Sequence, residues 1–188
     1  MPKSVDPVER RRQVVAALYR VVDAEGLDAA SLPRIARELN ATTGLLQKYF
    51  RSKDELLLFA QDQLLEELTA SVQAVLDQEG SLQDRLHRSL CAIALVGDAA
   101  RARVWLAFAA RAAANPVLLQ RHVEGARLIR DLCRTVLEGA GLDGGEAVGL
   151  AALVDGVTAQ RALEPEVMTE EVATHVIARH LERLWGST

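Results

Sequence analysis

A stretch of ten residues, ATTGLLQKYF at 41–50, brings several hydrogen-bonding side chains close together in the sequence. The groups are two hydroxyls, an amide and an ammonium, from Thr42, Thr43, Gln47 and Lys48. Gly44 leaves room for another molecule to approach the backbone closely. These groups suit hydrogen bonds to phosphates and to the edges of bases. The alternative is a surface helix whose polar residues are only solvated.

The apolar residues of this stretch predict how it is held. Leu46 and Phe50 have the i, i+4 spacing of one buried helix face. Upstream, Ser31 is a good N-cap, and Asn40 suits the left-handed conformation that closes a helix. We therefore expect a helix, a tight turn and a short second helix that ends near Lys48. In such a helix-turn-helix the second helix lies in the major groove of DNA.

Basic residues near this unit are candidates for phosphate contacts. Arg34 and Arg37 lie on the first of its two helices. The cluster Arg10–Arg12 could reach the DNA backbone or the minor groove, and the alternative is a solvated charge cluster. Residues 1–55 carry ten Lys/Arg and eight Asp/Glu, whereas residues 56–188 carry twelve and eighteen. A mildly basic head on an acidic body could meet a polyanion with the head only.

Helix signals follow one another along the chain, and strand alternation is nearly absent. We expect an all-α protein of about nine helices, with a three-helix head at residues 1–52 and a helical body at residues 53–188. A capping box at Ser52–Glu55 should open the long fourth helix. The expected helices span about 7–25, 31–40, 42–48, 53–76, 81–96, 98–113, 117–138, 146–163 and 169–184.

Composition narrows the class of protein. Hydrophobic residues make up 49% of the 188 residues, which is typical of a globular protein with a real core. There is no apolar run of about 20 residues, and the N-terminus lacks the apolar segment of a secretory signal. We therefore expect a cytoplasmic chain with no membrane partner. Cys91 and Cys133 are expected as buried thiols, with a regulatory disulfide as the alternative.

Catalytic, metal and cofactor sites are not predicted. The sequence shows no set of nucleophile and base and no glycine-rich phosphate loop, and Gly139–Gly145 has the character of a loop between helices. His175 and His180 are five residues apart, which does not place them on one helical face, and no Cys or carboxylate completes a metal site. An enzyme therefore has almost no support from the sequence.

Residues 11–57 resemble the DNA-binding domain of the TetR (tetracycline-repressor) family of bacterial transcription regulators. The matching pieces are Gly26-Leu27, SLPRIA at 31–36, TTGLL at 42–46 and YFRSKDELL at 49–57. The last of these is similar to the family signature F-x-S-K-[DE]-x-L. The resemblance implies that the residues facing DNA are Thr42, Thr43, Gln47, Lys48 and Tyr49.

The resemblance also implies that Lys53 reaches a phosphate, and a helix N-terminus with an ammonium is a good anion site. Tyr49 could equally be partly structural, packed beside Phe50. Gln47 departs from the family, which usually has a tyrosine there that contacts a phosphate. An amide could instead make a bidentate contact to adenine or a weaker phosphate contact. Pro33 replaces a residue that is more often polar in the family.

A dimerisation surface is expected in the body, because two-fold dimers read palindromic DNA. Two apolar stripes on the last two helices are the candidates, and in the TetR family this helix pair usually forms the dimer. The alternative is that the stripes belong only to the core of one subunit. The predicted interface residues are Leu150, Leu153, Val154, Val157, Val176, Ile177, Leu181 and Leu184.

The rest of the body is similar, more loosely, to the choline-responsive BetI-type branch, on Trp105–Ala110, Asn115-Pro116 and Leu153–Gly156. An unidentified small-molecule effector should bind among the middle helices, with the fourth helix as one wall. The aromatic pair in this region could form a cation cage or plain core. The candidate pocket residues are His87, Cys91, Trp105, Phe108, Arg111 and His122.

Taken together, these features predict a one-component transcriptional regulator. We expect a repressor that binds a palindromic operator as a homodimer and is released by the effector. A helical ligand-binding or protein-interaction module that has lost DNA binding is the alternative. Gln47 and the weakly basic head are the features that support this alternative.

Overall fold

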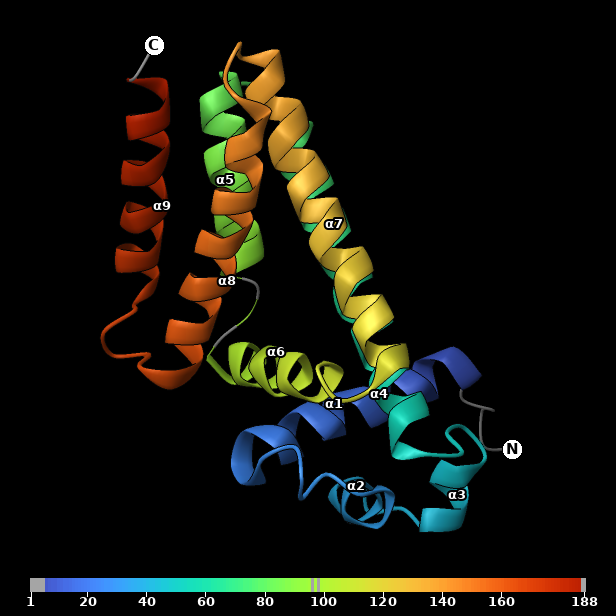
Figure 1. Cartoon of the computed structure of the whole chain (residues 1–188). Helices are drawn as coiled ribbons and strands as arrows, with labels where there is room; N and C mark the ends of the chain where they lie inside the picture. The colour runs from blue at the N-terminus through green and yellow to red at the C-terminus, as the bar shows by residue number, and fades with distance from the viewer. Residues whose placement is uncertain (1–5, 96, 98, 187–188) are drawn as a thin grey trace.

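The computed structural model describes residues 6–95, 97 and 99–186, and over these residues it is all-α, as expected. Nine α-helices are found in this part of the chain, with a single 3-10 turn at Gly144–Glu146 before α8 (Figure 1). The expected helix boundaries at Val96 and Asp98 lie outside the described residues. The helices are α1 Pro7–Glu25, α2 Leu32–Glu38, α3 Thr43–Gln47, α4 Lys53–Leu76, α5 Leu82–Ala94, α6 Ala99–Ala112, α7 Pro116–Gly139, α8 Ala147–Leu163 and α9 Glu170–Trp185.

Side-chain caps fix where most of these helices begin. The oxygens that accept a backbone N–H in the first turn come from Asp6, Ser31, Thr42, Ser52, Ser81, Asn115 and Thr169. Each such cap stabilises its helix by about 1 kcal/mol. The expected capping box at α4 is only half correct. Ser52 Oγ accepts from the N–H of Glu55, whereas the Glu55 carboxylate accepts from the N–H of Arg51 at 2.8 Å.

The head is a small three-helix unit whose core extends into the body. Helices α1, α2 and α3 lie together at one end of the molecule (Figure 1). Their buried residues form one cluster with Leu56, Leu57 and Ala60 of α4. Val104 and Phe108 of α6 belong to the same cluster. The division at residues 52 and 53 remains a prediction, and the packing places the first two turns of α4 with the head.

The body has a second hydrophobic core of its own. Its buried residues come from α5, α7, α8 and α9. In Figure 1, α6 crosses between this bundle and the head, close to α1. Arg103 of α6 donates to Asp23 of α1, and the guanidinium of Arg101 lies 5.8 Å from the ring centroid of Tyr19. Helix α6 is therefore the element through which the body rests on the first helix of the head.

A buried arginine holds the connection between α5 and α6. Arg161 of α8 is only 9% exposed. Its guanidinium donates to the carbonyls of Ala94, at 2.8 Å, and Gly97, at 3.1 Å. The first carbonyl belongs to the last residue of α5 and the second lies just beyond the helix, where backbone acceptors lack helical partners. The fork of Arg161 thus ties the start of α6 to α8.

Both cysteines are free in the structure. Cys133 is buried and Cys91 is half-buried, and both are free thiols. Burial raises the pKa of both thiols, that of Cys133 to about 11. No described helix has the length and apolar character needed to cross a membrane.

Candidate nucleic-acid interface and effector cavity

Helix α3 is fastened to the head by two side chains, as its spacing predicts. Leu46 is 2% exposed and Phe50 is completely buried. Both belong to the core cluster of the head, where Tyr49 packs against the same cluster while it stays half-exposed. Tyr49 therefore has a structural contact and a free edge. The five-residue helix depends on these anchors, because so short a helix has little stability of its own.

The other face of α3 is open to solvent. The exposed residues are Thr42, Gly44, Gln47 and Lys48, and Thr43 is half-exposed. Thr42 Oγ1 accepts from the N–H of Leu45 at 3.3 Å, so this hydroxyl caps the helix and keeps its own hydrogen for another partner. The side chains that the sequence assigns to DNA thus share one accessible surface. Whether they contact DNA remains a prediction.

The turn between α2 and α3 adopts the expected strained conformation. Asn40 has a φ of 51°, in the left-handed region that asparagine tolerates. The N–H of Ala41 then donates to the carbonyl of Ala36 at 2.9 Å, which closes the end of α2. This geometry turns the chain within the four residues between α2 and α3. It sets the angle between α2 and α3 that defines the helix-turn-helix.

Arg11 has a role that the sequence did not reveal. Its guanidinium lies 5.1 Å from the ring centroid of Phe50 and 5.2 Å from that of Phe59. It also donates to the carbonyl of Tyr49 at 3.0 Å. The cluster Arg10–Arg12 therefore does not act as one basic surface. Arg11 faces inward and joins α1 to the end of α3 by a cation–π contact and a hydrogen bond.

Two predicted phosphate contacts are occupied within the head. Arg34 forms ion pairs with Glu25, at 2.6 Å, and with Glu38, at 3.1 Å. Lys53 donates to the carbonyl of Leu27, and burial lowers the pKa of this ammonium. The structure thus gives Arg34 and Lys53 partners within the head, and their contacts to phosphate remain a prediction. Lys48, the C-cap residue of α3, is exposed.

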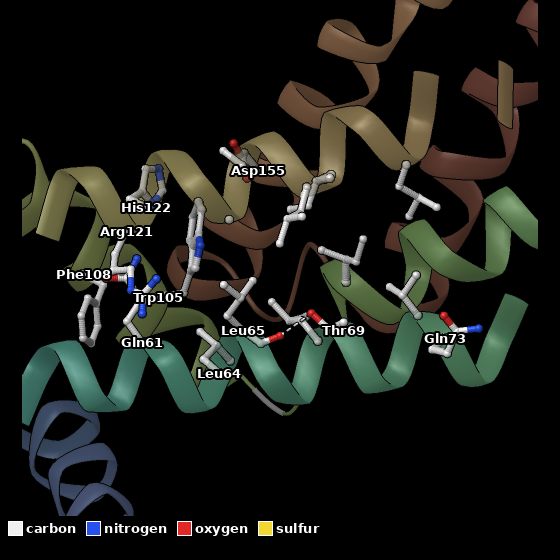
Figure 2. A pocket seen from close by; sticks show the side chains of 18 residues that line it. Gln61, Leu64, Leu65, Thr69, Gln73, Trp105, Phe108, Arg121, His122 and Asp155 are labelled. Atoms are coloured by element: carbon white, nitrogen blue, oxygen red, sulfur yellow. Dashed lines mark hydrogen bonds between the residues drawn. The ribbon is translucent and has the colours of Figure 1, made fainter. Parts of the chain in front are cut away.

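A cavity of about 250 Å³ lies between the helices of the body. Helix α4 forms one wall over the range 61–73, and α5, α6, α7 and α8 contribute the others (Figure 2). Among the predicted pocket residues, Trp105, Phe108 and His122 line it. The ring of Trp105 is 6.4 Å from that of His122, with an angle of 46° between the planes. A cavity therefore exists where the effector site is expected, with the fourth helix as one of its walls.

The other predicted pocket residues lie elsewhere. His87 and Cys91 face α9, because His87 Nε2 is 3.3 Å from the carbonyl of Thr174 and 3.5 Å from Cys91 Sγ. Arg111 lies 3.6 Å from the carboxylate of Asp54, at the junction with the head. These three residues do not line the cavity, so the six do not form one site. Helical spacing in the sequence did not show that His87 and Cys91 lie on the face of α5 that packs against α9 and not on the face toward the cavity.

Several residues that line the cavity were not predicted from the sequence. Gln61 and Thr69 of α4, Arg121 of α7 and Asp155 of α8 all line the cavity. Asp155 is half-buried, and burial raises the pKa of its carboxyl group more than His122 and Arg130 lower it. A carboxylate directly after the apolar first half of α8, between Val154 and Gly156, was the available signal. The cavity thus has an aromatic and polar end near Trp105 and a longer apolar part (Figure 2).

Comparison with protein families decides what this architecture belongs to. The model for bacterial regulatory proteins of the tetR family matches residues 14–59. The model for the C-terminal part of BetI-type transcriptional repressors matches residues 82–186, more than half of the chain. The chain belongs to the tetR family. Its TetR resemblance and its BetI-type body are thereby confirmed, and the chain is a DNA-binding transcriptional regulator.

Curated relatives agree over nearly the whole length of this tetR-family chain. The regulator BetI 2 of Chromohalobacter salexigens is 32% identical, with 98% of this chain and 92% of that protein aligned. BetI of Vibrio campbellii is 33% identical, with 97% and 96% aligned. PksA of Bacillus subtilis is 29% identical, with 98% and 94% aligned. All three are HTH-type transcriptional regulators and none is named as an enzyme.

Solved structures show the same tetR-family fold. A transcriptional regulator from Rhodococcus sp. Rha1 has a TM-score of 0.85 and 26% identity, and the match covers 94% of this chain and 96% of that one. A regulator from Saccharomonospora viridis, crystallised with choline, has a TM-score of 0.75 and 22% identity, with 94% and 95% covered. At 22% identity, the match to the Saccharomonospora regulator shows only that the two chains share a fold.

The predicted dimer residues of this tetR-family body pack within one subunit, and their part in a dimer remains a prediction. Five of them are fully or almost fully buried in the core of one subunit, namely Leu150, Val154, Val157, Ile177 and Leu181. Leu153, Val176 and Leu184 are only half-buried and pack against the same core. A side chain with no free surface cannot contact a second copy. In this structure the apolar stripe on each helix packs mainly against its own subunit.

Proposed function

We propose that this chain is a repressor that binds a palindromic operator as a homodimer and releases it when a small molecule fills the cavity. The observation that carries the proposal is the polar, solvent-exposed face of α3 on two buried anchors, Leu46 and Phe50. A groove-reading helix needs that combination. The family membership supports DNA regulation in the cytoplasm rather than catalysis.

The packing suggests how the cavity communicates with the head. Phe108 of α6 lines the cavity and also belongs to the hydrophobic core of the head. Helix α4 likewise begins in the head core and forms the cavity wall from Gln61 onward. A ligand that favours a different position of α6 or α4 therefore favours a different position of the head. Only a difference in affinity for the two states is required.

We assign the homodimer contact to the outer face of α8 and the residues that follow it. This face is exposed and free of charge over several turns, at Val148, Ala152, Gly156 and Leu163, with Val167 and Val172 beyond them. Val148 and Leu163 are 60% and 65% exposed, and a contiguous exposed apolar patch is a mark of an interaction surface. Small residues between them would let two helices approach closely. A second copy is the occupant we propose.

A gel-shift titration with the DNA flanking the coding sequence tests the proposal. We expect a shift at low salt that weakens steeply as salt rises, because phosphate binding releases counterions. A Gln47→Ala/Lys48→Ala double variant should lose the shift and keep its helical content. No shift of any flanking fragment at low salt would favour the module that has lost DNA binding. Choline, the ligand of the Saccharomonospora regulator, is the first compound to test for release.

A further inference from the structure

The cavity is elongated along α4. Its lining on this helix extends from Gln61 to Gln73, and the helical rise between these two residues is about 18 Å. Between these two glutamines, the wall is formed mainly by apolar side chains, among them Leu64, Leu65, Leu68 and Val72 (Figure 2). Ile93, Ile129 and Leu132 face them from α5 and α7. A ligand that fills this volume needs an extended apolar part.

The end nearest the head has an unused hydrogen-bond acceptor. The side-chain oxygen of Gln61 is buried and accepts no hydrogen bond from any residue that the structure describes. Buried polar atoms in proteins nearly always have a partner, and leaving one without is costly. Gln61 lines the cavity beside Trp105 and Arg121 (Figure 2). A ligand group that donates an N–H or O–H at this end would satisfy that oxygen.

The charge at this end favours a cation over an anion. Arg121 is already paired with Asp62 and with Glu124, each at 2.8 Å, so its charge is offset by two carboxylates. Asp155 projects from α8 into the same cavity, and His122 and Arg130 of α7 are the groups that act to lower its pKa. They do not compensate the burial of this carboxylate, because the pKa of Asp155 is raised overall. A second cation beside it would be favourable.

We propose that the cavity binds an amphipathic amine, with a protonated ammonium that bears N–H groups between Gln61 and Asp155 and an alkyl chain along α4. This inference rests on the cavity being the effector site proposed above. The ring of Trp105 adds a face on which a cation is attracted. A quaternary ammonium such as choline lacks the N–H donor that Gln61 needs and the chain that the apolar wall needs.

Direct titration tests the ligand class. In a Trp185→Phe variant, Trp105 is the remaining tryptophan, so its fluorescence reports on the cavity. We expect octylamine to bind more tightly than butylamine, with roughly a fourfold gain for each added methylene group. Octyltrimethylammonium, which keeps the charge and the chain but has no N–H, should bind at least tenfold more weakly. Tighter binding of octanoate, or equal binding of choline and octylamine, would overturn the inference.

Variants of Asp155 and Gln61 test the two polar contacts to the ammonium group. Asp155→Asn should weaken octylamine binding about tenfold or more and also raise the unfolding temperature of the free protein, because it removes a buried charge. Gln61→Leu should weaken binding by about tenfold, whereas Gln61→Glu keeps the acceptor and should bind at least as well as the wild type. Gln63→Leu, on the same helix but outside the cavity lining, is the matched control with unchanged affinity. Loss of binding in Gln61→Glu would show that the amide donates, which contradicts the inference.

The inference and the proposed function fail in different ways. If octylamine binds but no DNA fragment is shifted, the regulator model fails and the amine site stands. If DNA is shifted and another compound releases it while no amine changes the fluorescence of Trp105, the amine site is wrong and the regulator model stands. Fluorescence and gel shift are measured on the same full-length protein.

Discussion

The side-chain amide of Asn115 donates to the carboxylate of Asp54, with 3.1 Å between Nδ2 and Oδ2. The oxygen of the same amide caps α7 by accepting from the N–H groups of Val117 and Leu118. Asp54 lies in the first turn of α4. One asparagine thus joins the start of α7, in the body, to the start of the helix that leaves the head. Both helices line the cavity farther along.

Asn115→Asp should break this connection and leave the cap intact. An aspartate caps as well as an asparagine, but it cannot donate to Asp54 and it repels that carboxylate. We expect a loss of about 1 kcal/mol in the free energy of unfolding, because both groups are partly exposed. The double variant Asn115→Asp/Asp54→Asn exchanges the two groups and should recover most of that loss. Urea unfolding measures all three proteins, and a double variant no better than Asn115→Asp would refute the pairing.

Substitutions should show that Lys48 contacts DNA and that Lys53 stabilises the fold. Lys48 is exposed on α3, so Lys48→Ala should reduce the slope of log K against log salt by about 0.9 for each phosphate contact removed, or about two for the dimer. Its unfolding midpoint should not change. Lys53→Ala removes the donor to the Leu27 carbonyl and should lower the unfolding midpoint. Fluorescence anisotropy at several salt concentrations, with thermal unfolding, checks both. A smaller salt slope for Lys53→Ala with an unchanged unfolding midpoint would instead identify Lys53 as a phosphate ligand.

Ala152→Arg should dissociate the homodimer without unfolding the subunit. Ala152 is exposed on the outer face of α8, where the proposed partner helix leaves no space for a guanidinium. Two arginines related by the dimer axis would also repel each other. We expect the mass measured by light scattering to fall to that of one chain, with the helical circular dichroism retained. Gln120→Arg, on an exposed position of α7, is the control that should stay dimeric. An unchanged mass for Ala152→Arg would show that the dimer interface does not include the outer face of α8.

Tyr19 should make the protein less stable at high pH. Burial raises the pKa of this phenol from 10.0 to about 12, with a smaller contribution from Glu67. Between pH 10 and pH 12 the unfolded chain loses the proton and the folded chain keeps it, so stability falls as pH rises through this range. Full passage through it should cost about 2 to 3 kcal/mol. Tyr19→Phe removes the phenol, and its unfolding free energy should show a shallower decline. Parallel declines in the two proteins would exclude Tyr19 as the cause.

Local sequence determined the helices and the helix-turn-helix. Caps such as Ser31 and Thr42 and the left-handed Asn40 act within a few residues, so their effect can be predicted without knowledge of the fold. The anchors Leu46 and Phe50 were equally predictable, because a five-residue helix has only one face to bury. The exposed polar face of α3 then follows from the same periodicity.

Tertiary packing decided what each long helix presents to its neighbours. Leu150 and Val154 form an apolar stripe in the sequence, but a stripe does not say whether its partner is the same subunit or a second one. The internal ion pairs of Arg34 bring in Glu25 from the end of α1, and such pairing cannot be read from spacing on one helix. The same holds for the cavity, where Gln61, His122 and Asp155 come from three helices and meet only in the folded chain. Helical periodicity tells which residues share a face, and only the packing of the helices tells what that face touches.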